Sequence, residues 1–279
     1  AALLPLHFWL PGTYAEAPAP VAALFAVMTK IGAYAILRFY VLVFGPDLDV
    51  TANLIDDVLL YGALMTLAVG MIGILGARRL GRLAAFATIG SMGTLLIAIS
   101  VFTEASTAAA VYYALHSTLT GALLFLVVDL VRERRGALAG ALVPGPRMAQ
   151  HGMVTALWFG AAIATAGLPP LSGFVGKLLI LDAARGMADV WLIWGMILAT
   201  SLVAVLGFAQ AGSVVFWKTT GDEEAAAAKP ALPLVACFAL LAGIVALAVF
   251  AGPVMRYIEA MAAQLHAPAA YIAAVLGQG

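Results

Sequence analysis

The stretch PVAALFAVMTKIGAYAILRFYVLVF, residues 20–44, decides the fold class of this chain. Its only charges are Lys30 and Arg38, and it exceeds the roughly 20 apolar residues that a helix needs to cross a hydrocarbon core. It therefore predicts a membrane-spanning helix with a lysine near its centre. A cationic side chain at that depth is costly, so such residues usually face a protein-lined or watery interior and mark ion or proton paths.

The same composition extends over the whole chain of 279 residues, which is 64% hydrophobic and 10% charged with a mean hydropathy of +1.06. We expect an all-α, polytopic membrane helix bundle with seven full spans after one partial span. The predicted spans are Pro20 to Phe44, Val58 to Gly76, Leu83 to Phe102, Thr107 to Leu130, Gly152 to Ala184, Met187 to Phe216 and Leu232 to Gly252. Residues 1–252 then form the bundle, and residues 253–279 form an amphipathic C-terminal tail.

Charge is concentrated in the linkers, and its sign alternates along the chain. The linker that holds Asp47 and Asp57 is acidic, whereas Arg185 is a basic exception to the alternation. Because short cytoplasmic loops are enriched in Lys and Arg, three basic segments are predicted to be cytoplasmic, with the C-terminus outside. These segments are Arg78 to Arg82, Val131 to His151 and Lys218 to Lys229.

Several classes of function lack support. The net charge is zero and no basic cluster is interleaved with aromatic residues, so nucleic acid is not an expected partner. Cys237 is the single cysteine, which excludes an internal disulfide and a multi-cysteine metal site. No phosphate-binding loop, dinucleotide fingerprint, HExxH, CxxC or nucleophile elbow occurs. We expect no catalytic residue, cofactor or metal, and therefore a secondary transporter subunit rather than an enzyme.

Prolines interrupt the helical pattern at two places. Pro5 and Pro11 bracket an apolar stretch at the start, where the segment from Ala1 to Leu10 as a helix would cover only about half a bilayer. This start, without Met, predicts that an upstream portion precedes the chain. The second place is Gly167 to Pro170, where a discontinuous helix is expected, since proline frees backbone carbonyls. Such breaks often line transport sites, although ordinary kinks are the alternative.

Three buried titratable residues are the main candidates for proton translocation. Lys30 has the small residues Ala26 and Ala33 on its face, which allow close helix approach. Lys177 follows the Gly167 break, and Asp182 lies at a poor helical spacing for pairing with it. A buried lysine whose neutral form is accessible can accept and release protons. The alternatives are a snorkelling lysine at Lys30 and a structural ion pair with a neighbouring helix at Lys177.

His116 lies in the middle of its predicted span on a helical stripe with Tyr112 and Thr120. Histidine gains and loses a proton near neutral pH, which suits it to join two lysines in a proton wire. A structural histidine, hydrogen-bonded across helices, is the alternative. His7 and Glu16 are further supporting candidates near the start, whereas Arg38, close to its span's end, is interpreted as an interfacial anchor.

The segments LPLHFWLPGTYAEAPAPVAALFAVMTKIGAYAILRF, residues 4–39, and GLPPLSGFVGKLLIL, residues 167–181, carry a family resemblance. They resemble the antiporter-like membrane subunits shared by respiratory complex I and the multisubunit Mrp/Pha cation/proton antiporters, with the D type most similar. The closing AYIAAVLG, residues 270–277, points the same way. The resemblance implies the C-terminal portion of a 14-helix subunit that contains discontinuous helices.

By this resemblance, Lys30, His116 and Lys177 match a buried row along which the family is thought to pass protons. Some relatives carry another lysine about one turn after the histidine, whereas this chain has Thr120 and Gly121. The resemblance implies a Na+(K+)/H+ antiporter subunit of the bacterial cytoplasmic membrane, with other hydrophobic subunits, monovalent cations, protons and membrane lipids as its partners. A proton-pumping complex I subunit and a non-transporting membrane scaffold are the alternatives.

Overall fold

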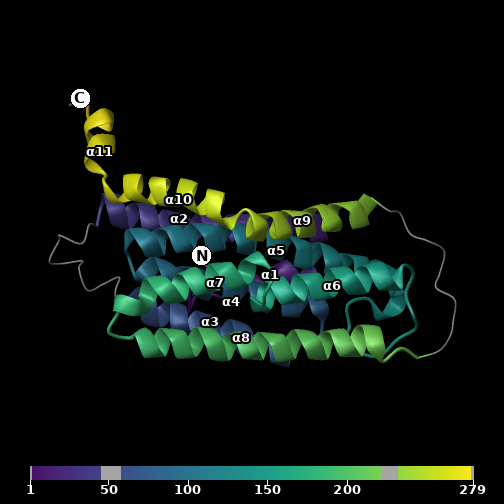
Figure 1. Cartoon of the computed structure of the whole chain (residues 1–279). Coiled ribbons are helices and arrows are strands. Elements are labelled where there is room, and N and C mark those ends of the chain that lie inside the picture. The colour runs from purple at the N-terminus through teal and green to yellow at the C-terminus, as the bar shows by residue number, and fades with distance from the viewer. Residues whose placement is uncertain (1, 45–57, 221–231, 278–279) are drawn as a thin grey trace.

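The computed structural model describes residues 2–44, 58–220 and 232–277, and this part of the chain is a bundle of helices without a strand (Figure 1). The predicted all-α fold class is therefore confirmed. The helices are α1 (Trp9–Glu16), α2 (Ala19–Leu42), α3 (Leu60–Gly76), α4 (Leu80–Ser100), α5 (Glu104–Arg134), α6 (His151–Ala166), α7 (Ser172–Ala183), α8 (Val190–Gly212), α9 (Leu232–Val249), α10 (Ala251–His266) and α11 (Ala269–Val275).

Five of the described helices are long and apolar enough to cross a membrane: α2, α4, α5, α8 with its π-helical extension to Trp217, and α9. Helices α3 and α6 are shorter apolar helices. Each predicted span thus corresponds to a helix whose ends differ by a few residues from the prediction. The acidic linker at Asp47 and Asp57 lies outside the described residues.

The predicted break divides one span into α6 and α7. Helix α6 ends at Ala166, and Gly167 follows with a φ of 76°, a left-handed conformation that glycine adopts without steric strain. Helix α7 begins only at Ser172, after Pro169 and Pro170. The discontinuous helix is therefore confirmed, and its break lies between two elements that run end to end (Figure 1).

The partial helix predicted from Ala1 to Leu10 is wrong in its bounds. Residues 4–8 form turns, and α1 runs from Trp9 to Glu16. Pro11 lies in the first turn of α1, where its missing N–H has no partner to lose, so the helix passes through it. Proline therefore marks the start of this helix rather than its end.

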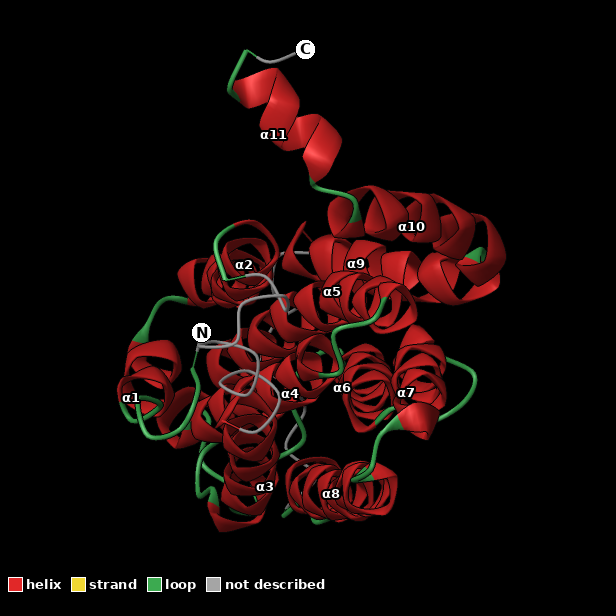
Figure 2. Cartoon of the chain, turned by 90° about the vertical axis from the view of Figure 1, so that its left-hand side faces the viewer, coloured by secondary structure: helices red, strands yellow, loops and turns green. Residues whose placement is uncertain are grey.

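Helices α4 and α5 form the middle of the bundle, with the other helices around them in the end-on view (Figure 2). Helices α3 and α4 approach so closely that their glycines face the partner's backbone: a Cβ at Gly70 would overlap Gly90, and one at Gly93 would overlap Leu67. Small residues at such crossings are what membrane helix packing requires, because close van der Waals contact replaces the hydrophobic driving force.

Two of the predicted cytoplasmic segments, with the start of the third, lie together at one end of the bundle. Leu80 N–H donates to the carbonyl of Gly140 at 2.8 Å, and Thr220 N–H donates to the carbonyl of Gly145 at 3.0 Å. The remainder of the third segment, residues 221–231, falls outside the described part of the chain. The shared end agrees with the alternating loop charges, while its assignment to the cytoplasm stays a prediction.

The last helices follow the length of α5. Cys237 is buried beneath α9, as a small core residue should be. Helix α10 packs against α5 through Ile258 and Ala262, and the ring of His266 lies 2.9 Å from the hydroxyl of Thr107. Helix α11 projects from the bundle (Figure 2). The division into a bundle and a tail at residue 252 stays a prediction.

The α3–α4 crossing yields a first prediction. Gly93→Ala should lower the free energy of unfolding by about 1–3 kcal/mol, because the added methyl overlaps the backbone of Leu67 in a tightly packed interface. Gly195→Ala on α8 is the matched control, since a Cβ there meets nothing within 4 Å. Thermal unfolding of the purified protein in detergent measures both. Equal melting temperatures for the two variants would contradict the close crossing.

The contact of His266 yields a second prediction. Burial lowers the pKa of His266 below its ordinary 6.5, and nearby Glu104 acts in the opposite sense. Since the unfolded histidine binds its proton more tightly, this contribution to stability is present above about pH 6.5 and is lost as the pH falls below it. Amide hydrogen exchange in α10 should therefore accelerate between about pH 7.5 and about pH 5.5, across the usual histidine titration. His266→Gln should remove that dependence, and an unchanged pH profile in this variant would overturn the assignment.

Candidate functional site

Helix α5 brings the three main candidates together, because it contacts both α2, which carries Lys30, and α7, which carries Lys177. His116 lies on α5 itself. The exposed fractions of Lys30, His116 and Lys177 are 7%, 2% and 6%, so all three side chains are withdrawn from the surface of the described chain. Both lysines act electrostatically on His116. The structure thus gathers one imidazole and two amines that lie far apart in the sequence.

Lys177 is held by the helix break. Its Nζ donates to the carbonyl oxygen of Ala166 at 2.8 Å and to the hydroxyl of Ser201 on α8 at 2.8 Å. The Ala166 carbonyl is available because α6 ends there instead of continuing into α7. Asp182 pairs instead with Arg185, with 2.9 Å between Oδ1 and Nε. Neutral oxygens therefore hold Lys177, and no salt bridge is formed by it within the described residues.

The two ring nitrogens of His116 face different groups. Nδ1 lies 2.9 Å from the hydroxyl of Ser172 at the start of α7 and 3.4 Å from that of Thr120. The other side of the ring meets the backbone of Ala164, near the end of α6. A carbonyl at Nε2 and a hydroxyl at Nδ1 select the neutral tautomer with its proton on Nε2. Gly173 permits this approach, since a Cβ there would lie 2.8 Å from Nε2.

A small cavity of about 20 Å³ adjoins His116. Its polar lining includes Thr88, Ser91, Ser117 and Thr120. A cavity holds a water molecule when its volume exceeds roughly 10–15 Å³ and polar partners are present. The space beside the imidazole is therefore large enough, and polar enough, for one bridging water.

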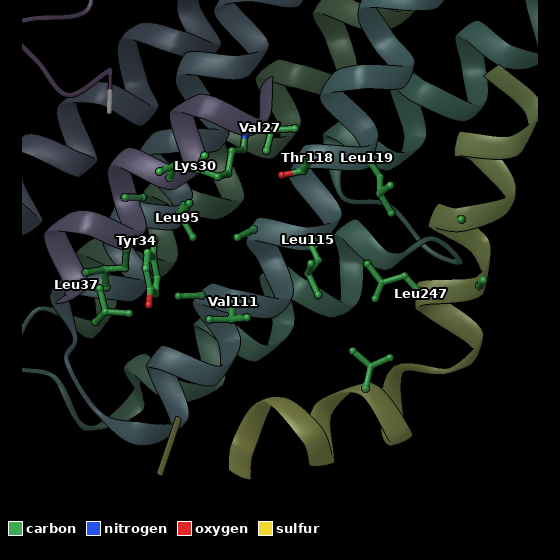
Figure 3. Close-up of a pocket in the computed structure, with 18 of the residues that line it drawn as sticks. Val27, Lys30, Tyr34, Leu37, Leu95, Val111, Leu115, Thr118, Leu119 and Leu247 are labelled. Atoms are coloured by element: carbon green, nitrogen blue, oxygen red, sulfur yellow. The ribbon is translucent and has the colours of Figure 1, made fainter. Parts of the chain in front are cut away.

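Lys30 has different surroundings. Its Nζ is buried and finds no hydrogen-bond partner among the described residues. The small residues on its face are buried as expected, and Ala26 approaches α5 where a Cβ at Gly121 would lie 3.2 Å away. Lys30 also lines a cavity of about 650 Å³ between α2, α5, α9 and α10, where apart from Tyr34 and Thr118 the other lining side chains are apolar (Figure 3).

The supporting candidates are more scattered. Thr120 contacts His116, whereas the Tyr112 hydroxyl donates to the carbonyl of Leu247 at 2.9 Å. His7 lies in the turns before α1, and its Nδ1 finds no partner within the described residues. Glu16 ends α1 beside Arg79 and two other arginines at the basic end of the bundle. A role in proton translocation stays a prediction for each of the four.

Two serines that contact the site were not predicted. Ser172, in the LPPLSGF stretch after the break, contacts His116, and Ser201, in the apolar run of α8, accepts from Lys177. A hydroxyl within an apolar membrane helix is a weak signal, because it can return its proton to its own backbone. Ser201 does this as well, donating to Ile197 at 2.6 Å. Only the packing of α8 against α6 and α7 shows its second role.

The hydrogen bond at Ser201 yields a third prediction. Ser201→Ala should lower the free energy of unfolding by about 1.5–3 kcal/mol, the usual range for a hydrogen bond to a charged group. Thr200→Val is the matched control, because the Thr200 hydroxyl donates only to backbone carbonyls of its own helix. Denaturation of both variants under the same conditions provides the comparison. A Ser201→Ala variant as stable as Thr200→Val would show that Lys177 does not depend on this hydroxyl.

Known proteins share both the sequence and the fold. The chain is 33% identical to the D component of a probable K+/H+ antiporter from Rhizobium meliloti over 309 residues, which cover 99% of the chain and 56% of that protein. It is 33% identical to the D component of a Na+/H+ antiporter from Bacillus subtilis over 278 residues, covering 98% of the chain and 55% of that protein. The chain thus spans about half the length of these relatives.

A solved structure of the Mrp complex from Dietzia sp. DQ12-45-1b contains a chain with the same fold. The TM-score is 0.84 at 22% identity, and the match covers 99% of this chain and 58% of that chain. Residues 1–207 also match the family model described as "NADH:quinone oxidoreductase/Mrp antiporter, TM". This protein is therefore an integral, multi-pass membrane protein that belongs to the NADH:quinone oxidoreductase/Mrp antiporter transmembrane family.

Proposed function

We propose that this chain is the proton-translocating part of a multisubunit Na+/H+ or K+/H+ antiporter, and that Lys30, His116 and Lys177 relay the protons. The observation that carries the proposal is the buried row itself, in which two amines flank an imidazole across three helices. Ionisable groups at membrane depth are costly to maintain, so their grouping favours a transport role. The names of the relatives from Rhizobium meliloti and Bacillus subtilis support the same activity.

In the proposed relay, Lys177 exchanges its proton within the break between α6 and α7. Its two acceptors, the Ala166 carbonyl and the Ser201 hydroxyl, hold the amine in place without a fixed negative charge. A carboxylate partner would stabilise the ammonium form strongly, whereas neutral acceptors leave both protonation states accessible. Lys177 is therefore suited to bind a proton and to release it again.

His116 is the middle station. Its Nδ1 accepts a proton from the side of Ser172, Thr120 and the adjoining polar cavity, and its Nε2 releases the one that it carries towards α6. Lys30 forms the other end of the row on α2. Like charges within a low-dielectric interior repel one another, so that loading one station promotes release from the next. Cation movement elsewhere in the assembly would drive protons through this coupling.

The wider assignments follow from the family. We infer that other hydrophobic subunits of an antiporter complex are the partners, that Na+ or K+ is the exchanged cation, and that the bacterial cytoplasmic membrane is the location. The cluster of basic loops at one end of the bundle supports an orientation with that end in the cytoplasm.

A proton-pumping complex I subunit is the second candidate, because the family description names NADH:quinone oxidoreductase together with the Mrp antiporter. In that case quinone reduction in other subunits supplies the energy, and the assembly is a translocase. Purification of the native assembly distinguishes the two. Hydrophobic antiporter subunits as companions support the first candidate, and peripheral flavin and iron–sulfur subunits support the second.

Substitution tests the relay, and this is the fourth prediction. Lys177→Ala and His116→Ala in the full-length protein should abolish cation-dependent proton flux in vesicles, since each removes a station that binds a proton. Lys218→Ala is the matched control, because Lys218 lies exposed at the end of the helical run that begins with α8. All variants should assemble with the partner subunits.

The opposite outcome has a defined meaning. Normal flux in Lys177→Ala within an intact assembly would show that the buried groups lock helices together, as buried polar groups sometimes do. The chain would then be a membrane scaffold, and the relay would be rejected.

A further inference from the structure

The large cavity beside Lys30 continues towards the end of α2. A second cavity of about 240 Å³ shares Tyr34, Leu37 and Val111 with the first, so that the two form one groove. Lys30 lies at one end of this groove and Arg38 at the other. At 1.5 Å per residue, the two residues are about 12 Å apart along α2. This is close to the roughly 15 Å depth of one leaflet of the hydrocarbon core.

The walls of the groove have one chemical character. Val111, Leu115 and Leu119 of α5 form its floor, and Leu247, Phe250 and other residues of α9 and α10 face α2 across it (Figure 3). None of the acidic side chains in residues 2–44, 58–220 and 232–277 lines either cavity. The groove is thus an apolar channel with a cation at each end. Such a surface complements an anionic molecule with an apolar chain.

Arg38 marks the end that is suited to a headgroup. Its guanidinium carbon lies 4.9 Å from the ring centroid of Tyr271, and Gln264 lines the same cavity. Stacking on an aromatic ring fixes the guanidinium plane and leaves its N–H edges free, a geometry that matches phosphate. No salt bridge involves Arg38 within the described part of the chain. A phosphate there would complete a site that the protein leaves positively charged.

The width of the groove distinguishes a lipid chain from a protein helix. The first cavity extends from Val27 to Leu37, about 15 Å along α2. Its volume of about 650 Å³ therefore corresponds to a mean cross-section of about 45 Å². A helix with a diameter of about 10 Å occupies roughly 80 Å². The space is too narrow for a helix and is open to lipid along its length.

We propose that this groove binds one anionic phospholipid, with its phosphate at Arg38 and one acyl chain extending between α2, α5 and α9–α10 to the level of Lys30. The bound chain covers the side of Lys30 that faces the membrane. It therefore separates the amine from the bilayer without providing a counter-charge. This site is independent of the proposed proton relay, because neither Arg38 nor Val111 belongs to the row.

Lipid retention tests the site, as the fifth prediction. The full complex is purified, washed with detergent, and its remaining phospholipids are identified by native mass spectrometry. The wild type should retain one phosphatidylglycerol or cardiolipin per copy of this chain. Arg38→Gln and Val111→Trp should reduce that occupancy about tenfold or more, as expected when a charge-assisted contact is lost or the chain site is filled. Arg256→Gln on α10 and Leu202→Trp on α8 are matched controls at exposed positions outside the groove, and they should match the wild type.

A second measurement keeps the test decisive if Val111→Trp fails to assemble. Added dioleoyl-phosphatidylglycerol should raise the melting temperature of the wild-type complex more than dioleoyl-phosphatidylcholine does, and Arg38→Gln should lose this difference. Equal retention in Arg38→Gln and Arg256→Gln would overturn the proposal, as would retention of a free fatty acid alone. A photo-cross-linker at Leu115 that captures a peptide in place of a phospholipid would overturn it in favour of a protein occupant.

Discussion

The hydrogen bond from Lys177 to the Ala166 carbonyl is the constraint on which the rest of the site depends. An ammonium in an apolar bundle requires oxygen acceptors, and a continuous helix offers none, because its carbonyls are already bonded within the helix. The Gly167 to Pro170 break solves this by ending α6 at the depth of the lysine. The same break starts α7 at Ser172, which contacts His116. One local departure from helical geometry thus provides partners for two titratable side chains.

The position of α5 gives the site its second property. This helix packs against α2, α4, α6, α7, α9 and α10, so that groups from opposite sides of the bundle meet along it. Its small residues and hydroxyls, including Gly121 and Thr120, leave space for close packing on one side and for a polar cavity on the other. Rigid glycine-mediated packing joins α4 to α3, whereas the side that faces α9 and α10 retains the large groove. The site therefore lies between a densely packed wall and a loosely packed one.

Much of this arrangement can be predicted from the sequence, because hydropathy and proline placement are local signals. Lys30, His116 and Lys177 stand out since a titratable group within an apolar run is rare, and Pro169 and Pro170 indicate the break. The partners are not predictable in the same way. Asp182 pairs with Arg185 rather than with Lys177, and Ser201 reaches Lys177 only through helix packing. The start of α1 differs from the prediction because proline is compatible with both a helix start and a helix break, and only the fold shows which one applies.

The burial of Cys237 has a practical consequence. It is the single cysteine of the 279 residues, and α9 holds its thiol fully covered. A membrane-permeant maleimide can therefore modify this chain only when α9 separates from its neighbours. Labelling kinetics at that one position would report the movement of α9 in an unmodified sequence. The protein thus contains its own chemical probe for opening of the loosely packed side, without any engineered residue.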